Sequence, residues 1–151
     1  MNIQIIEAVK ETLQVIIKCS QVNDEVMRLK RHIESFDQKI QAKKENELYF
    51  VESSDVLYFE SVDNRTFLYT EQDVMEVKLR LYELETMLSD KDFIRISKSL
   101  IVNINKIRAL KPELNRTISV TMCNGEQLSI SRKYVKALRT MLAIGGKYAK
   151  S

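Results

Sequence analysis

The chain has 151 residues, which is room for one domain of ordinary size or for one domain with a small appendage. Its 44% hydrophobic residues, single proline and three glycines exclude a disordered chain and indicate regular structure. No run approaches the roughly 20 apolar residues of a membrane-spanning helix, and the N-terminus does not resemble a signal peptide. We therefore expect a cytoplasmic protein.

Charge is distributed unevenly along the chain. Residues 1–92 carry 12 Lys and Arg against 19 Asp and Glu, a net charge of −7. Residues 93–151 carry 12 Lys and Arg against two Glu, a net charge of +10. The usual partner of such a basic segment is a polyanion, with nucleic acid first and an acidic membrane second. The alternative is a basic segment paired with the acidic half of the same protein.

Residues that bind metals or act as nucleophiles are few and scattered. Cys19 and Cys123 lie 104 positions apart, which predicts two reduced, buried thiols. His32, the only histidine, falls in a charged helical stretch and is expected at the surface. Zinc sites need clustered ligands, and a catalytic triad needs a nucleophile beside a base. We therefore expect no metal, no cofactor, no small-molecule substrate and no enzymatic activity.

The first 45 residues are predicted to form a strand-helix segment. Apolar and polar residues alternate over 3–5 and 13–17, a pattern typical of one or two short strands. A helix over 22–36 follows, with apolar residues three or four apart, and Ser20 or Asn23 can cap it. The segment is interpreted as a helix packed on its own small sheet, with a dimer contact as the alternative.

Strand signals are dense in the next part of the chain. The polar run over 41–47 is either a link or a hairpin turn. Leucines at helical spacing then predict a short helix over 81–88. Between these two segments, a meander of about four strands is predicted by β-branched and aromatic runs over 48–51, 56–59, 66–70 and 74–78.

The basic half contains a predicted hairpin and a terminal helix. Alternating apolar residues on both sides of Asn124-Gly125 are the strongest short signal for a hairpin, because both turn residues tolerate positive φ. Ser131 is placed to cap the last helix. Arg132 and Lys133 at its N-terminus cost the helix a few tenths of a kcal/mol, which an anionic partner would offset.

Three stretches of the chain resemble the signature of LytTR DNA-binding domains. They are DVLYFES at 55–61, FIRISKSLIVN at 93–103, and the pair NGE and ISRKY within 124–134, in the order of the family. The resemblance covers residues 46–144 and leaves 145–151 as a C-terminal tail. It implies an α+β, mostly β fold, in which a small N-terminal strand/helix segment precedes a multi-stranded antiparallel β module with short helices.

The resemblance also implies which residues contact DNA. Lys98 and Lys133 correspond to the principal base-contacting positions, and Arg65 lies in the loop that supplies a third contact region. Lysine offers guanine a point charge where arginine offers a planar fork, so weaker base discrimination is expected at Lys133. The positions that contact the DNA backbone or support the loops are Asn64, Thr66, Arg95, Ser97, Ser99, Ser131, Arg132, Tyr134 and Lys136.

The leading hypothesis is a transcriptional regulator that binds double-stranded DNA sequence-specifically, through inter-strand loops and the basic half, as a homodimer on repeated half-sites. Residues 1–45 are too few for the receiver domain of many family members, so the chain is expected to be response-regulator-like in its DNA-binding part alone. Restraint by a membrane protein is one route of control, with the N-terminal segment as the docking or dimerisation surface. The alternative is a protein-interaction module that docks an acidic partner or a membrane surface.

Overall fold

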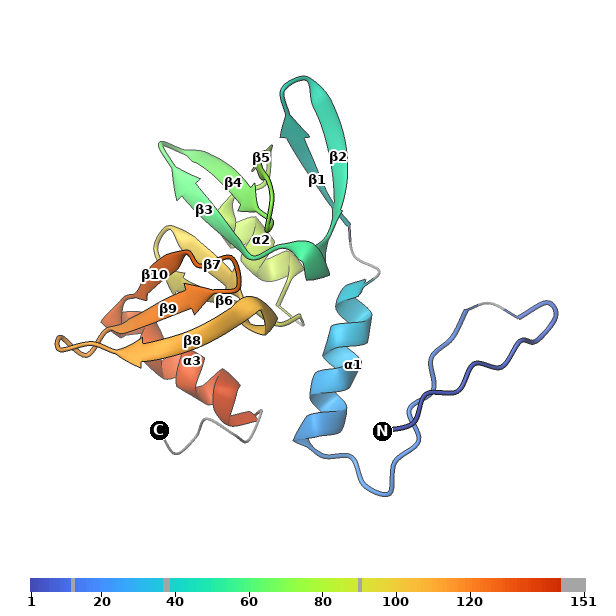
Figure 1. Ribbon diagram of the computed structural model, residues 1–151. Coiled ribbons are helices and arrows are strands. Elements are labelled where there is room, and N and C mark those ends of the chain that lie inside the picture. Colours follow the sequence, from blue (N-terminus) through green and yellow to red (C-terminus); the bar gives the residue numbers. More distant parts are fainter. Residues whose placement is uncertain (12, 37–38, 90, 145–151) are drawn as a thin grey trace.

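The protein is an α+β structure dominated by two antiparallel sheets (Figure 1). The computed structural model describes residues 1–11, 13–36, 39–89 and 91–144. These contain ten strands and three helices longer than a single turn, which confirms the predicted mostly β fold class. No helix among the described residues is long and apolar enough to cross a membrane.

The larger sheet has seven strands in the order β2-β1-β5-β4-β3-β7-β6, and all neighbouring pairs are antiparallel. Helix α2 (Leu81–Met87) contributes Leu81 and Leu84 to the apolar core that forms with this sheet. The strands are β1 (Lys39–Lys44), β2 (Glu47–Glu52), β3 (Tyr58–Val62), β4 (Arg65–Tyr69), β5 (Val74–Val77), β6 (Phe93–Ser97) and β7 (Leu100–Asn103).

The predicted meander is correct for β3, β4 and β5 and wrong for β2. β2 lies at the far edge of the sheet, because β1 pairs with both β2 and β5 and separates them. The polar run over 41–47 therefore forms a hairpin and not a link, with Glu45 at a φ of 58° in its turn. The inward-facing residues of β1 are just Ile40 and Ala42, too few to give a recognisable strand pattern.

The smaller sheet consists of β8 (Ile107–Pro112), β9 (Ile118–Met122) and β10 (Gln127–Ile130), with α3 (Arg132–Ile144) after it. The hairpin predicted around Asn124-Gly125 is confirmed. Gly125 takes a φ of 90° and its N–H donates to the Met122 carbonyl over 2.9 Å, whereas Asn124 keeps a negative φ. Only one of the two turn residues therefore needs the left-handed conformation.

Residues before the first sheet behave differently from the prediction. The described residues among 1–23 form no strand, and most of their side chains are exposed. Helix α1 (Asp24–Phe36) does form, and Asn23 caps it by accepting a hydrogen bond from the Val26 N–H over 3.0 Å.

The prediction that both thiols are buried is wrong, because Cys19 is exposed and Cys123 is half-buried, although both are free. His32 is exposed, as predicted.

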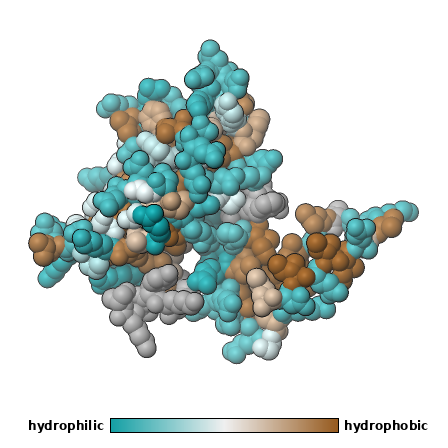
Figure 2. Space-filling view, in the orientation of Figure 1, coloured by the Kyte–Doolittle hydropathy of each residue, from teal (hydrophilic) through white to brown (hydrophobic). Residues whose placement is uncertain are grey.

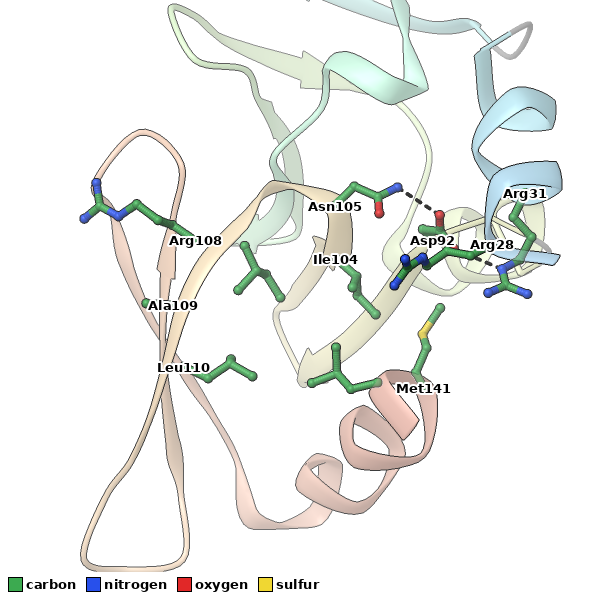
Figure 3. Close-up of a pocket in the computed structure, with 11 residues that line it drawn as sticks. Arg28, Arg31, Asp92, Ile104, Asn105, Arg108, Ala109, Leu110 and Met141 are labelled. Atoms are coloured by element: carbon green, nitrogen blue, oxygen red, sulfur yellow. Dashed lines mark hydrogen bonds and ion pairs between the residues drawn. The ribbon is translucent and has the colours of Figure 1, made fainter. Parts of the chain in front are cut away.

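The prediction that helix α1 packs on a small sheet of its own is wrong. The helix instead contacts the module that follows it in the chain. Its Arg31 pairs with Asp92, and Asp92 also accepts a hydrogen bond from Asn105 Nδ2 over 2.8 Å. A cavity of about 420 Å³ lies between α1, β8 and α3 (Figure 3). Arg28 points into this cavity above Ile104, so polar side chains of α1 face a lining that is largely apolar on the side of the module.

Candidate nucleic-acid interface

The first predicted contact region is the tight turn between β3 and β4. Val62 pairs with Arg65, so Asp63 and Asn64 form a two-residue loop, and their φ values of 51° and 63° are both left-handed. This is the type I′ geometry that matches the twist of a hairpin, and Asp and Asn tolerate it. Arg80 fixes the turn from outside, since its Nη1 donates to the Asn64 carbonyl over 3.0 Å.

Arg65 and Thr66 differ in accessibility. Arg65 is 62% exposed, but its guanidinium already binds both carboxylate oxygens of Glu76 on the adjacent strand. This hydrogen bond raises the pKa of Arg65 and lowers that of Glu76. Thr66 is buried, so its side chain can support the turn but cannot reach a ligand. An anionic partner that uses Arg65 must compete with Glu76.

The second contact region is the turn between β6 and β7. Ser97 pairs with Leu100, which leaves Lys98 and Ser99 as a two-residue loop after a register shift in β6. Arg95 holds this loop from beneath, since its guanidinium donates to the carbonyls of Ser97 and Lys98 over 2.8 and 2.5 Å. The Lys98 side chain is exposed and has no ion pair within the described residues. Arg95 therefore acts as a support, and Lys98 is the accessible cation.

The third contact region is the start of α3. Ser131 precedes the helix at the predicted cap position, but its hydroxyl makes no hydrogen bond to the described residues. Its carbonyl instead accepts a hydrogen bond from the Tyr134 N–H over 2.8 Å. Arg132 and Lys133 are exposed, and Lys133 Nζ lies 5.6 Å from the centre of the half-buried Tyr134 ring. The helix thus begins with two cations that face solvent.

Two backbone hydrogen bonds join the three regions into one surface. The Ser61 N–H, near the end of β3, donates to the Ser99 carbonyl over 2.9 Å. The Ser131 N–H, at the start of α3, donates to the Ile96 carbonyl over 3.0 Å. The β6–β7 turn consequently lies between the other two. We call the side chains of Asn64, Arg65, Lys98, Arg132 and Lys133 the turn surface.

A basic groove adjoins the turn surface. It has a volume of about 600 Å³ and is lined on one side by the β8–β9 loop and on the other by α3. Lys136 was predicted as a supporting residue and lies here, but Arg116 and Arg139 were not singled out from the sequence. The groove is lined by a single acidic residue, Glu113, and by four cationic residues, Arg116, Arg132, Lys136 and Arg139.

The cations of the basic half remain available to a partner. Of the ten Lys and Arg described between residues 93 and 144, eight are exposed. Within the described part of the chain, the ion pair that involves this set is Arg95 with Glu85, at 3.8 Å. The alternative that the basic half neutralises itself against the acidic half is therefore wrong for these residues. An exposed and largely unpaired set of cations is the electrostatic signature of polyanion binding.

Two stacked tyrosines stiffen the strands behind the β3–β4 turn. The rings of Tyr58 and Tyr69 lie 4.3 Å apart and within 14° of parallel. The Tyr69 hydroxyl donates to Glu60 over 2.9 Å. Burial, together with this hydrogen bond, raises the pKa of Tyr69 to about 12. Burial likewise raises the pKa of Tyr58. Both rings stay neutral at physiological pH and hold β3 against β4.

Comparisons with known proteins agree with this geometry. The family model of the LytTr DNA-binding domain matches residues 46–143. The solved LytTr DNA-binding domain of a Bacillus cereus protein, described as a putative methyl-accepting/DNA response regulator, superposes with a TM-score of 0.67 at 32% identity. That alignment covers 70% of this chain and 97% of the other.

Curated relatives extend the comparison beyond the domain. An uncharacterized HTH-type transcriptional regulator of Staphylococcus aureus (strain MSSA476) is 31% identical over 95% of this chain and 99% of its own length. The sensory transduction protein LytT of Bacillus subtilis (strain 168) is 27% identical over 91% of this chain, which spans 56% of LytT. The match of the family model over residues 46–143 shows that this chain belongs to the LytTr DNA-binding domain family.

Proposed function

We propose that the chain is a cytoplasmic regulator of transcription that recognises a specific duplex DNA sequence through its inter-strand turns and its basic half. The observation that carries the proposal is the juxtaposition of the two turns and the start of α3 by the Ser61–Ser99 and Ile96–Ser131 backbone hydrogen bonds. Both turns are short and held by hydrogen bonds from an arginine side chain, Arg80 for one and Arg95 for the other, so their side chains are presented from a rigid frame. No recognition helix is needed for this mode of binding.

Base reading and phosphate binding are assigned to different parts of the surface. Lys98 and Lys133 of the turn surface are exposed to solvent and are assigned to base reading. Arg65 is assigned the same role once its ion pair with Glu76 is broken. Lysine and arginine bind guanine O6 and N7 in the major groove. The groove with Arg116, Lys136 and Arg139 is suited to the phosphate backbone, where positive charge supplies affinity without sequence information.

Regulation requires more than the DNA-binding module. Residues 1–45 are proposed as the dimerisation or regulatory docking segment, with a homodimer on repeated half-sites as the DNA-bound form. A membrane protein that restrains this segment is the proposed route of control. The S. aureus relative, named as a transcriptional regulator, aligns over nearly all of this chain, which supports a regulatory unit that includes the N-terminal residues.

Selection of duplexes from a random library, followed by fluorescence anisotropy at about 0.15 M salt, tests the proposal. We expect a preferred duplex to bind at least roughly 10³-fold more tightly than random duplex. Heparin and vesicles of anionic phospholipid serve as competitors. If no duplex is preferred and either competitor displaces DNA completely, the chain is instead a module for an acidic partner or a membrane surface, as the alternative hypothesis states.

A further inference from the structure

The N-terminal arm, residues 1–22, exposes apolar side chains whose contact with water is unfavourable in an isolated monomer. Nine of the seventeen large hydrophobic residues exposed in the described chain lie in this arm. Figure 2 shows apolar side chains gathered along it. Contiguous exposed apolar surface of this kind marks an interaction site.

Strand β2 offers a second unpartnered surface. It is an edge of the seven-stranded sheet, and its exposed residues include Leu48 at 57% and Phe50 at 59%. Natural edge strands are blunted by lysine, proline or a bulge, whereas β2 (ELYFVE) has neither residue and pairs with β1 in unbroken register. Leu48 and Phe50 share the outer face of the sheet, because their β1 partners are Lys43 and Gln41 and not the buried Ile40 and Ala42.

The arm segment over 13–18 (LQVIIK) has the length and pattern to pair with β2. Val15 and Ile16 are 59% and 69% exposed, and side chains along this segment alternate in direction if it is extended. An antiparallel register that places Lys18 opposite Glu47 joins opposite charges at one end. The same register gives three apolar pairs, namely Ile17 with Leu48, Ile16 with Tyr49 and Val15 with Phe50.

The arm of the same molecule cannot reach this register. Helix α1 has 13 residues and so spans about 20 Å, and the six residues of β2 span about another 20 Å. Figure 1 shows α1 and the β1–β2 hairpin running end to end, so the tip of the hairpin, where β2 begins, lies far from the N-terminal end of α1 that the arm joins. The six residues after Lys18 cover at most roughly 21 Å when fully extended. The occupant must therefore come from another chain.

We propose that the N-terminal arm of a second copy of this chain adds to β2 as an antiparallel strand, and that two copies exchange arms reciprocally. This deepens the proposed homodimer, on which it rests, by naming the surfaces that form it. Figure 1 places the arm on the side of the molecule opposite the tip of the β3–β4 hairpin and the β8–β9 loop. A dimer formed by arm exchange therefore leaves the turn surface and the basic groove of both copies open to DNA.

Cysteine cross-linking tests the register directly. In a Cys19→Ser, Cys123→Ser background, Val15→Cys and Phe50→Cys face each other across the proposed strands. Directly opposite residues of an antiparallel pair have Cα atoms about 4.5–5.5 Å apart, within disulfide range. We expect a dimer on a non-reducing gel. The matched control is Ile16→Cys with Phe50→Cys, which point to opposite faces and give little cross-link. No dimer band, a cross-link within one chain, or equal yields from both variants overturns the proposal.

Light scattering with gel filtration tests the assembly without disulfides. We expect a wild-type dimer at tens of micromolar and a monomer for Phe50→Lys, whose side chain is exposed in each copy and whose replacement leaves the fold intact by circular dichroism. The matched control Tyr82→Lys alters a 67% exposed residue on α2 and stays dimeric. A wild-type monomer, or a Phe50→Lys dimer, overturns the proposal, as does a wild-type monomer that floats with anionic phospholipid vesicles.

DNA binding separates this inference from the proposed function. Monomeric Phe50→Lys is expected to bind a single half-site within about twofold of wild type, and to bind paired half-sites at least tenfold more weakly. If wild-type protein dimerises but prefers no duplex, the proposed function fails and the arm exchange stands. If paired half-sites bind wild-type and Phe50→Lys protein equally, the arm exchange fails and the proposed function stands.

Discussion

Arg31 of α1 and Asp92, in the turn before β6, form an ion pair with 3.1 Å between Nε and Oδ1. The side chains are 22% and 8% exposed, so both charges are largely removed from water. Asn105 Nδ2 also donates to Asp92 over 2.8 Å, and the Asn105 amide lies 3.1 Å from a ring nitrogen of His32. This polar cluster connects α1 to the DNA-binding module.

Removal of one partner of this pair is expected to destabilise the protein strongly. Arg31→Ala leaves the Asp92 carboxylate buried without its counter-charge, which costs about 3 kcal/mol in urea unfolding. The neighbouring Lys30→Ala is the matched control, because Lys30 pairs with Glu34 on the exposed face of the same helix and is expected to cost less than about 1 kcal/mol. Equal effects of the two variants would mean that α1 is not docked through Asp92.

Lys98 is expected to carry sequence discrimination. Lys98→Ala removes the exposed cation of the β6–β7 turn and leaves the hydrogen bonds from Arg95 to the carbonyls of residues 97 and 98 intact. Affinity for the preferred duplex should fall by roughly 1–3 kcal/mol, with relaxed preference at one base position. Anisotropy titrations on preferred and random duplexes measure both effects, with Lys30→Ala as the control. An equal loss of affinity for both duplexes would show that Lys98 binds phosphate and does not read a base.

Glu76 is expected to restrain Arg65. The hydrogen bond from Arg65 holds the pKa of Glu76 below its ordinary range, so the pair stays ionised and closed at neutral pH. Glu76→Gln weakens the competitor and should strengthen binding to the preferred duplex roughly two- to fivefold, in line with the small strength of exposed pairs. Glu25→Gln on α1 changes the net charge equally and is the matched control. If both variants gain alike, the effect is general electrostatics and Arg65 does not contact a base.

The sequence was sufficient to predict most strands, α1, α2 and the β9–β10 hairpin, because their apolar spacing or turn chemistry is local. It was insufficient for the position of β2, since the pairing of β1 with β5 joins residues 43 and 76 across 33 positions. It also failed for residues 1–23, where alternation implies a strand and the monomer provides no partner. Alternation of apolar and polar residues indicates that a segment can form a strand. It does not indicate whether a neighbouring strand is available to pair with that segment.

The candidate site shows the same division between local and long-range information. Lys98 and Lys133 lie in motifs with a recognisable order, so resemblance was enough to single them out. Arg116 lies in a loop that carries no motif, and only the packing of the β8–β9 loop near α3 brings it to Arg139. The Arg65–Glu76 pair was also missed, since cross-strand neighbours depend on the register of β4 with β5.

The basic groove is expected to contribute affinity without specificity. Arg116→Gln and Arg139→Gln each remove one cation from the groove and should weaken preferred and random duplexes by the same factor. For each phosphate that the protein no longer neutralises, the slope of log K against log salt should also decrease in magnitude by about 0.9. Lys30→Gln, with an equal change of charge on α1, should leave the slope unchanged. If affinity falls for the preferred duplex alone, these arginines read bases and do not serve only to bind phosphate.

Alkaline pH is expected to destabilise the protein through the tyrosines behind the β3–β4 turn. Because burial and the Glu60 hydrogen bond raise the pKa of Tyr69 to about 12, the folded state keeps a proton that the unfolded chain releases near pH 10. The stability that this group contributes is present below pH 10 and is lost as pH rises toward 12. Tyr69→Phe cannot ionise and should flatten the dependence of the urea midpoint on pH in this window. Some slope remains, since burial also raises the pKa of Tyr58. The exposed Tyr82→Phe is the control, and a slope in Tyr69→Phe equal to that of wild type would show that Tyr69 is not held neutral by the fold.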